Sequence, residues 1–152
     1  MTSSKSIALM FTDIVGYSQM IAKNEANALK LLDEHNKIIF PIIEKNQGKV
    51  IKLIGDSIFA KFASSEKLII AAISIQTELK DRNNIRNKND SINIRVGLHK
   101  GYVIDKDNDL FGHDVNLCSR IESVTQSGSI TISEEMFQSI TNVEDIFHRK
   151  ID

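Results

Sequence analysis

A short turn between two apolar runs constrains the fold of this chain more than any other feature of its sequence. In KVIKLIGDSIFAKF (49–62), Gly55 and Asp56 separate an apolar run at 50–54 from a second run at 58–62. A Gly-Asp pair between two strand-forming runs is a strong signal for a β-hairpin. Two antiparallel strands therefore follow one another directly, without the helical crossover that parallel strands require.

The hydrophobic periodicity of the rest of the chain predicts helices and strands around this hairpin. Apolar residues at three- and four-residue steps indicate helices, whereas short apolar or alternating runs indicate strands. We expect a helix at 17–46, weakened near its end by Pro41, and a second helix that begins at Ser64 or Ser65. Strands are expected at 7–11, 50–54, 58–62, 92–98, 101–104 and 129–132, a loop at 105–114, and further helices at 115–124 and 133–140. The two hairpins in this order exclude the regular strand–helix alternation of a doubly wound sheet.

Composition and charge limit the classes of protein to which the chain can belong. Its 152 residues suit one domain with a sizeable core, and a formal net charge of −1 excludes general nucleic-acid binding. Cys118 is the single cysteine, so the chain has no intrachain disulfide and suits a reducing compartment. No apolar run approaches the ~20 residues that span a bilayer. We expect a cytoplasmic protein without a nucleic-acid partner and without membrane contact from this chain.

Two carboxylates stand at the ends of predicted strands. Asp13 follows the first strand, and Asp56 lies in the hairpin turn. If the second strand pairs beside the first, both side chains meet at one end of the sheet, where they repel unless a proton or a cation lies between them. Mg²⁺ is usually held by few protein oxygens, with waters and phosphates completing its octahedron. The pair therefore indicates phosphoryl or nucleotidyl transfer.

Simpler interpretations of these polar residues stay open at this point. Asp13 could cap the helix that follows it, and Asp56 could be an ordinary turn residue. The spacing of His99 and His113 matches no zinc site, so packing or surface roles are expected for both.

Three motifs resemble one known family. FTDIVGYS (11–18), KLIGDSIFA (52–60) and RVGLHKGYV…DLFGHDVNLCSRIES (95–123) resemble, in order, the class III adenylyl/guanylyl cyclase catalytic domain. The resemblance runs from about residue 7 to residue 140. It implies an α+β fold, the ferredoxin-like β-α-β-β-α-β cyclase fold with extra C-terminal β/α elements, and a head-to-tail homodimer whose active sites combine residues of both subunits.

The resemblance also assigns roles by position. It implies two Mg²⁺ or Mn²⁺ ions as cofactors and ATP or GTP as the substrate of a cyclase. The matching positions are Asp13, the backbone carbonyl of Ile14 and Asp56 for metal, Lys52 and Asp109 for the base, and Asn116 and Arg120 for the transition state. From the residues alone, an exposed helix side with solvated charges at Arg120 and Glu122 would be the simpler interpretation of the last pair.

The chemistry of the base-recognising pair favours ATP. Lys52 is only a donor, and ionised Asp109 is only an acceptor. Adenine presents an acceptor ring nitrogen beside a donor amine, which complements this pair, whereas guanine presents the opposite polarity. Guanylyl members of the family typically carry Glu and Cys at these positions, and Cys118 occupies neither of them. We expect Cys118 to be a small packing residue.

The C-terminal end departs from the family pattern. The family continues into a last strand pair whose LKG-like lysine contacts the terminal phosphates, and Arg149 and Lys150 do not match it. We therefore expect residues 1–152 to form one cyclase catalytic domain truncated at its C-terminal end, which binds ATP poorly and has little activity. The alternatives are a catalytically weak cyclase-homology module for dimerisation or regulation, and a guanylyl cyclase. A receiver-type signalling domain is disfavoured because it needs the alternation that the hairpin interrupts.

Overall fold

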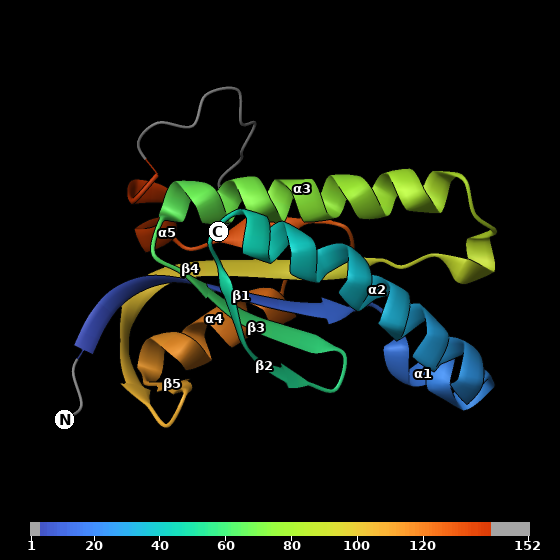
Figure 1. The fold of residues 1–152 in the computed structure, drawn as a ribbon, viewed down its shortest axis with the longest axis horizontal. Helices are drawn as coiled ribbons and strands as arrows, with labels where there is room; N and C mark the ends of the chain where they lie inside the picture. The colour runs from blue at the N-terminus through green and yellow to red at the C-terminus, as the bar shows by residue number, and fades with distance from the viewer. Residues whose placement is uncertain (1–3, 141–152) are drawn as a thin grey trace.

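A mainly antiparallel sheet with helices on both faces forms the centre of the structure (Figure 1). The computed structural model describes residues 4–140. Its strands are β1 Ser4–Ile14, β2 Lys49–Ile54, β3 Ser57–Phe62, β4 Ile94–Lys106, β5 Asp109–Phe111 and β6 Ile130–Ile132. Its helices are α1 Tyr17–Lys23, α2 Glu25–Lys45, α3 Ser65–Asn84, α4 His113–Ser123 and α5 Glu134–Gln138, with a short 3₁₀ helix at Lys88–Asp90. The predicted α+β class is confirmed.

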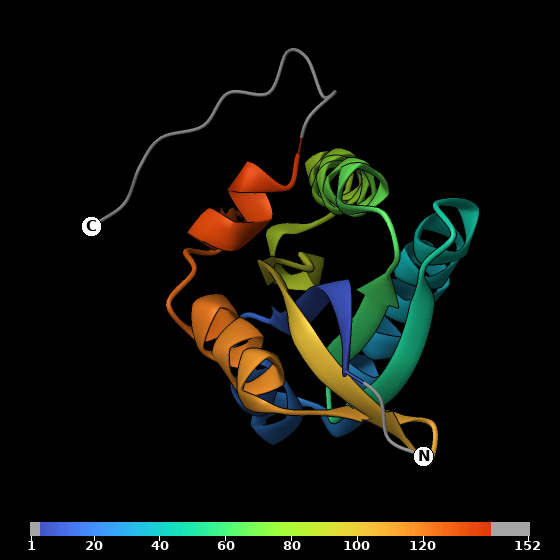
Figure 2. The same ribbon diagram turned by 90° about the vertical axis from the view of Figure 1, so that its left-hand side faces the viewer.

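The sheet order places β1 at the centre. The strands run β2-β3-β1-β4-β5, and β6 pairs with β4 in parallel. Side chains of β1 alternate between two cores, because successive residues of a strand point to opposite faces. Ala8 and Met10 pack with α2 and α3, whereas Leu9 and Phe11 pack with α4. Figure 2 shows α2 and α3 on one side of the sheet and α4 on the other.

The predicted long helix at 17–46 is wrong in one respect, because it is broken at Asn24. This residue is extended, with φ −161° and ψ 96°, and its side chain accepts a hydrogen bond from Asn27 N. Asn24 therefore ends α1 and caps α2, a role that asparagine favours. α2 then continues past Pro41 to Lys45.

The second hairpin also differs from the prediction. The two strands expected at 92–98 and 101–104 form one strand, β4, and the turn comes later, at Asp107 and Asn108. Both residues have positive φ, of 54° and 61°, which Asp and Asn tolerate better than most residues do. The expected loop therefore contains a short strand, β5, which carries Asp109.

In the described part of the chain, no helix is long and apolar enough to cross a membrane. The last strand pair of the family and the position of Arg149 and Lys150 lie outside the described residues.

Two glycines of β4 allow α4 to lie directly on the sheet. A Cβ atom at Gly97 would come within 2.5 Å of Glu122 N, and one at Gly101 within 2.3 Å of Asp114 Cγ. Both distances are shorter than real Cβ contacts: a side chain at Gly97 would meet the backbone of α4, and one at Gly101 would meet the side chain of Asp114. The position of α4 therefore depends on the absence of two side chains.

We predict that Gly97→Ala destabilises the protein by about 1–3 kcal/mol, because the added methyl group overpacks the contact between β4 and α4. Urea unfolding measures the effect. Ser119→Ala, on the exposed side of the same helix, is the control and should change the free energy of unfolding by less than about 0.5 kcal/mol. Equal effects of the two substitutions would contradict this account of the contact.

Candidate active site

Asp13 and Asp56 converge at one end of the sheet. Asp13 precedes the last residue of β1, and Asp56 lies in the turn between β2 and β3. Ile14 N donates a hydrogen bond to Asp56 Oδ2 at 2.7 Å, so the backbone that follows Asp13 holds the second carboxylate. β1 pairs with β3 and β4, and β2 lies at the sheet edge. β2 therefore does not pair beside β1, but the tip of the β2–β3 hairpin still reaches the end of β1.

Two further charged residues surround Asp13. Arg95 lies opposite it in the β1–β4 register, with Nη1 3.3 Å from Asp13 Oδ1. Glu122 of α4 is only 6% exposed, and its carboxyl group hydrogen-bonds to Asp13. Burial, and then the charge and hydrogen bond of Asp13, raise the pKa of Glu122 to about 7. Glu122 is therefore a buried member of the carboxylate cluster, and its interpretation as a solvated charge is wrong.

The sequence offered only a weak signal for these two neighbours. Arg95 faces Asp13 because β4 pairs with β1, although 82 positions separate the two residues in the sequence. Glu122 points inward because it follows Cys118 by four residues, and Cys118 lies on the buried side of α4. The apolar period of the helix could have indicated this orientation.

The donor set at this end of the sheet suits a hard divalent cation. Two carboxylates and the backbone carbonyl of Ile14 are the oxygen ligands that Mg²⁺ prefers, and Mg²⁺ sites often use only one or two carboxylates with water and phosphate. Within residues 4–140, no group of three or more His, Cys, Asp or Glu side chains could hold a metal ion together. An ion at Asp13 and Asp56 would therefore depend on other oxygens, as in phosphate-bound Mg²⁺.

Lys52 and Asp109 form an ion pair across the two edges of the sheet. Lys52 belongs to β2 and Asp109 to β5, which lie at opposite ends of the strand order, yet their side chains are 2.9 Å apart. The sheet must therefore curl strongly. The hydrogen bond from Lys52 outweighs the effect of burial and lowers the pKa of Asp109.

An aromatic floor lies beneath this ion pair. Lys52 Nζ is 6.0 Å from the centroid of the Phe59 ring, and Phe59 stacks on Phe11 at 4.4 Å. A donor and an acceptor thus stand side by side above apolar rings, which suits a flat heterocycle that needs both.

Asn116 and Arg120 lie on the exposed side of α4, on one face of the helix. The opposite side of the helix, with Val115 and Cys118, packs on the sheet. Burial raises the pKa of the Cys118 thiol, as expected for a packing residue. Because Glu122 extends inward to Asp13 whereas Asn116 and Arg120 point outward, a single chain does not direct all the predicted site residues to one point.

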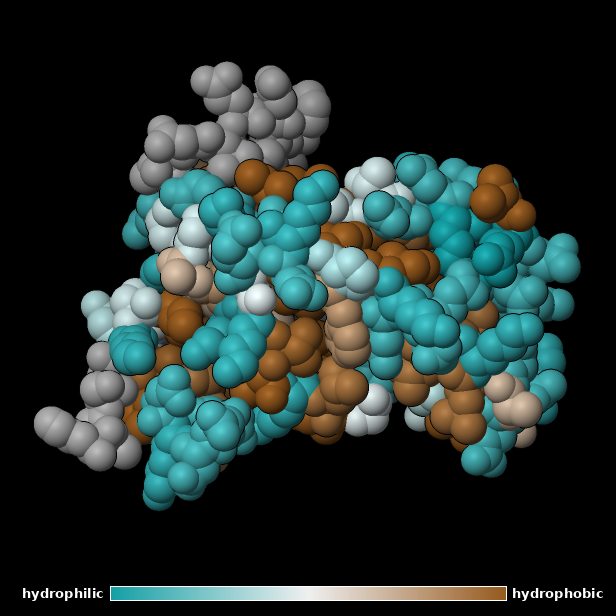
Figure 3. Space-filling model, in the orientation of Figure 1, coloured by the Kyte–Doolittle hydropathy of each residue, from teal (hydrophilic) through white to brown (hydrophobic). Residues whose placement is uncertain are grey.

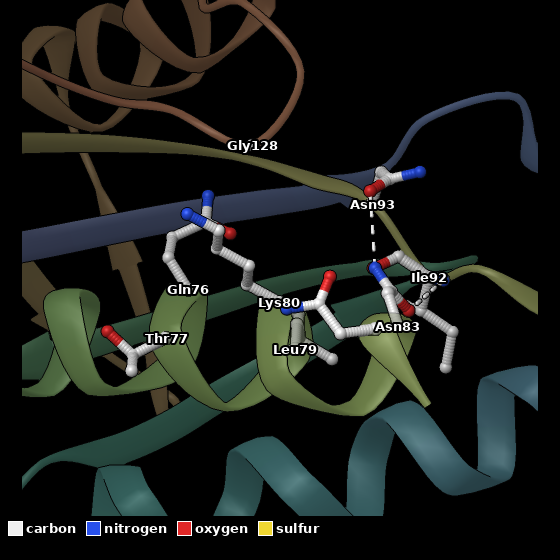
Figure 4. Close-up of a pocket in the computed structure, with 9 residues that line it drawn as sticks. Gln76, Thr77, Leu79, Lys80, Asn83, Ile92, Asn93 and Gly128 are labelled. Carbon is white, nitrogen blue, oxygen red and sulfur yellow. Dashed lines mark hydrogen bonds between the residues drawn. The ribbon is translucent and has the colours of Figure 1, made fainter. Parts of the chain in front are cut away.

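A separate hollow of about 340 Å³ lies between α3 and the start of β4 (Figure 4). Its amide side chains connect the two elements: Gln76 Nε2 donates to Ile94 O and Ser129 O, and Asn83 Nδ2 donates to Ile92 O. None of the predicted site residues lines the hollow. Its polar side chains therefore stabilise a seam between elements and do not form part of the candidate active site.

Comparison with known proteins gives one consistent family. Residues 1–150 match the family described as the adenylate and guanylate cyclase catalytic domain. A putative adenylate cyclase 3 of Rhizobium meliloti is 30% identical over 140 residues, which cover 91% of this chain and 24% of that protein. The chain thus spans about a quarter of that relative.

Solved structures show the same fold. An adenylate/guanylate cyclase/hydrolase from Silicibacter pomeroyi has a TM-score of 0.84 at 27% identity, covering 91% of this chain and 81% of that one. The adenylyl cyclase CyaB from P. aeruginosa has a TM-score of 0.78 at 25% identity, with the same coverages of 91% and 81%.

The raised pKa of Glu122 predicts a pH-dependent stability in metal-free protein. The folded state holds this proton to about pH 7, whereas the unfolded chain releases it near the ordinary value of 4.5. Stability is therefore lost as the pH rises from about 4.5 through about 7. We predict that Glu122→Gln, which cannot ionise, is more stable than the unaltered chain at pH 8 by about 1–3 kcal/mol and similar to it at pH 4.5.

Urea unfolding at the two pH values, with divalent ions chelated, measures this difference. Glu134→Gln, on the exposed start of α5, is the control. A Glu122→Gln difference that does not change with pH would contradict the placement of Glu122 beside Asp13.

Proposed function

This chain belongs to the class III adenylyl and guanylyl cyclase catalytic domain family, and on that premise we propose that it converts ATP to 3′,5′-cyclic AMP and pyrophosphate. The observation that carries the choice of ATP is the 2.9 Å pair of Lys52 and Asp109. Two relatives have names that agree with it, the putative adenylate cyclase of Rhizobium meliloti and the adenylyl cyclase CyaB, whereas other relatives are named guanylate cyclases.

In this proposal the base is recognised when the ion pair of Lys52 and Asp109 is replaced by two hydrogen bonds from these side chains to the base. In the free protein Lys52 and Asp109 satisfy each other. An adenine that enters between them offers its ring nitrogen to Lys52 and its amine to Asp109. Guanine offers a donor to Lys52 and an acceptor to Asp109, which leaves like groups facing each other. Sites that mispair buried polar groups in this way reject substrates by roughly 10⁴–10⁵-fold.

Asp13, Asp56 and the carbonyl of Ile14 would hold two Mg²⁺ or Mn²⁺ ions. Bound there, the ions supply Lewis acidity to the ribose 3′-hydroxyl and disperse charge on the phosphates. The protein's part is to hold the oxygen ligands together despite their repulsion: Ile14 N holds Asp56, and Arg95 compensates Asp13. Glu122 adds a hydrogen bond that keeps Asp13 at the strand end.

In the reaction, the ribose 3′-hydroxyl releases its proton to solvent and its oxygen attacks the α-phosphorus, a new P–O bond closes the ring, and pyrophosphate leaves with the electrons of the broken P–O bond. Negative charge accumulates on the phosphoryl oxygens during this step. Arg120 can offer a planar fork of donors to that charge, and Asn116 can donate from the same helix face.

We infer a head-to-tail homodimer as the active form. Asn116 and Arg120 point outward, so a second chain is the natural source of the carboxylates that complete each site. Exposed apolar side chains support such an interface. They lie at the end of β2 (Leu53 and Ile54) and on the β4–β5 ribbon (Tyr102, Ile104 and Phe111). Figure 3 shows apolar surface on the face that carries the β2–β3 hairpin. Two different exposed sets suit an interface in which one end of each chain contacts the other end of its partner.

We predict that the chain, incubated with Mn²⁺ and either nucleotide, forms cyclic AMP in preference to cyclic GMP. Replacement of the base-recognising residues by the guanylyl-type residues, Lys52→Glu with Asp109→Cys, should lower kcat/KM for ATP by roughly 100-fold or more, because both hydrogen bonds to adenine are lost. Lys49→Glu, on the same strand, is the control. Equal or greater formation of cyclic GMP by the unaltered chain would contradict the proposed substrate and favour a guanylyl cyclase.

The composite site predicts complementation between inactive chains. Asp13→Asn and Arg120→Ala should each abolish activity, whereas a re-equilibrated equal mixture should recover about one quarter of the unaltered activity, since half of the dimers are mixed and each has one intact site. Mixing Asp13→Asn with Asp56→Asn is the control and should recover nothing. Failure of the first mixture to recover activity, with dimers present by sedimentation, would contradict the shared site.

A further inference from the structure

A buried chain of hydrogen bonds connects three elements behind the exposed residues of α4. His99 of β4 is 1% exposed, and both of its ring nitrogens have close partners. Nε2 is 2.8 Å from Asp114 Oδ1, in the first turn of α4, and Nδ1 is 2.7 Å from Ser133 Oγ, the N-cap of α5. His99 is thus more than a packing residue, because it joins the starts of two helices.

The end of this hydrogen-bond chain in α4 is held tightly. Asp114 Oδ2 accepts a hydrogen bond from Tyr102 N at 2.9 Å, so both carboxylate oxygens have a donor. Gly101 leaves room for the carboxylate, since a Cβ atom there would lie 2.3 Å from Asp114 Cγ. Burial raises the pKa of Asp114, but the hydrogen bonds from His99 and Tyr102 N outweigh it and lower the pKa overall. The ionised form is therefore the one that the site favours.

The α5 end is equally specific. Ser133 Oγ accepts a hydrogen bond from Met136 N at 3.1 Å, which caps α5 and leaves the hydroxyl proton available. That proton can be donated to His99 Nδ1 while Nε2–H is donated to Asp114. In a neutral ring, every donor of the chain then has an acceptor. Such buried chains are stiff, because a shift of one member leaves its neighbour without a partner.

We propose that Asp114, His99 and Ser133 form a positioning relay that couples the start of α5 to the orientation of α4. This inference rests on the proposed function, because Asn116 and Arg120 of α4 are the residues that it would position. Asp114 lies in the turn from which Asn116 projects, so a movement of the β6–α5 junction reaches the transition-state residues through His99. The base-recognising residues and the proposed metal ligands belong to other elements, so a movement of the β6–α5 junction does not shift them directly.

Two serine residues of the protein allow a matched test of this relay. Ser133 and Ser64 are both N-caps whose Oγ accepts a backbone N–H three residues later, at 3.1 Å and 3.2 Å. Their replacement by alanine removes caps of similar kind. Only Ser133 touches His99, so a difference between the two variants reports the relay and not the loss of a cap. The serine is changed because replacement of buried His99 would also leave a cavity.

The first measurement is the kinetics of cyclic nucleotide formation. Ser133→Ala should lower kcat by about 10-fold with KM little changed, because misplacement of catalytic groups affects the reacting geometry more than binding of the base. Ser64→Ala should leave kcat within about twofold, and Ser133→Thr, which keeps the hydroxyl, should restore it. Equal losses in the two alanine variants, or no loss in Ser133→Ala, would overturn the relay.

The second measurement needs no catalytic activity. Hydrogen exchange of the backbone amides in α4 should become roughly 10-fold faster in Ser133→Ala and stay unchanged in Ser64→Ala, because the first turn of α4 loses its anchor. If the chain forms no cyclic nucleotide, the proposed function fails, and the exchange result still decides the relay. Unchanged exchange in α4 of Ser133→Ala would overturn it.

Discussion

Repulsion between carboxylates at the end of β1 is the constraint that the rest of this structure satisfies. Asp13, Asp56 and Glu122 gather around one strand end, and Arg95 is the cation that contacts Asp13. The pKa of Glu122 is raised, so this side chain can carry a proton where a third negative charge would be unfavourable. Asp56 is held in place by the hydrogen bond that its carboxylate accepts from Ile14 N. These contacts hold Asp13 and Asp56 at the strand end, where the two side chains could bind the proposed divalent ion.

The curled sheet has a second consequence for the same reaction. It brings β2 and β5 together although they are the two ends of the strand order, and so it joins Lys52 to Asp109. The base-recognising pair and the carboxylate pair thus lie on different parts of one sheet, and in the proposed dimer each nucleotide would take the two pairs from different subunits. α4 lies on that sheet through Gly97 and Gly101, and it presents Asn116 and Arg120 outward, where the proposed dimer would place a second chain.

Local patterns predicted the parts of this fold that depend on neighbours in the sequence. The Gly55-Asp56 hairpin and the apolar run before Asp13 are read correctly because turn chemistry and strand burial are local. The break at Asn24 and the turn at Asp107 and Asn108 were missed, because periodicity favours one long element over two that are separated by a single capping or turn residue.

The candidate site shows the same division. The resemblance placed Asp13 and Asp56 in one role and Lys52 and Asp109 in another, and the structure brings each pair together. Arg95 and Glu122 could not be assigned from spacing alone. Their contacts with Asp13 depend on the β1–β4 register and on which side of α4 faces the sheet, and both are properties of the tertiary fold.

Asp13 and Asp56 are proposed to hold a divalent ion together. Electron paramagnetic resonance of Mn²⁺, which loses its sharp free-ion signal on binding, tests this directly in millimolar Mn²⁺ without nucleotide. We expect the unaltered chain and the surface variant Asp33→Asn to reduce the free signal, whereas Asp13→Asn and Asp56→Asn leave it unchanged. Equal loss of signal with all four proteins would contradict it.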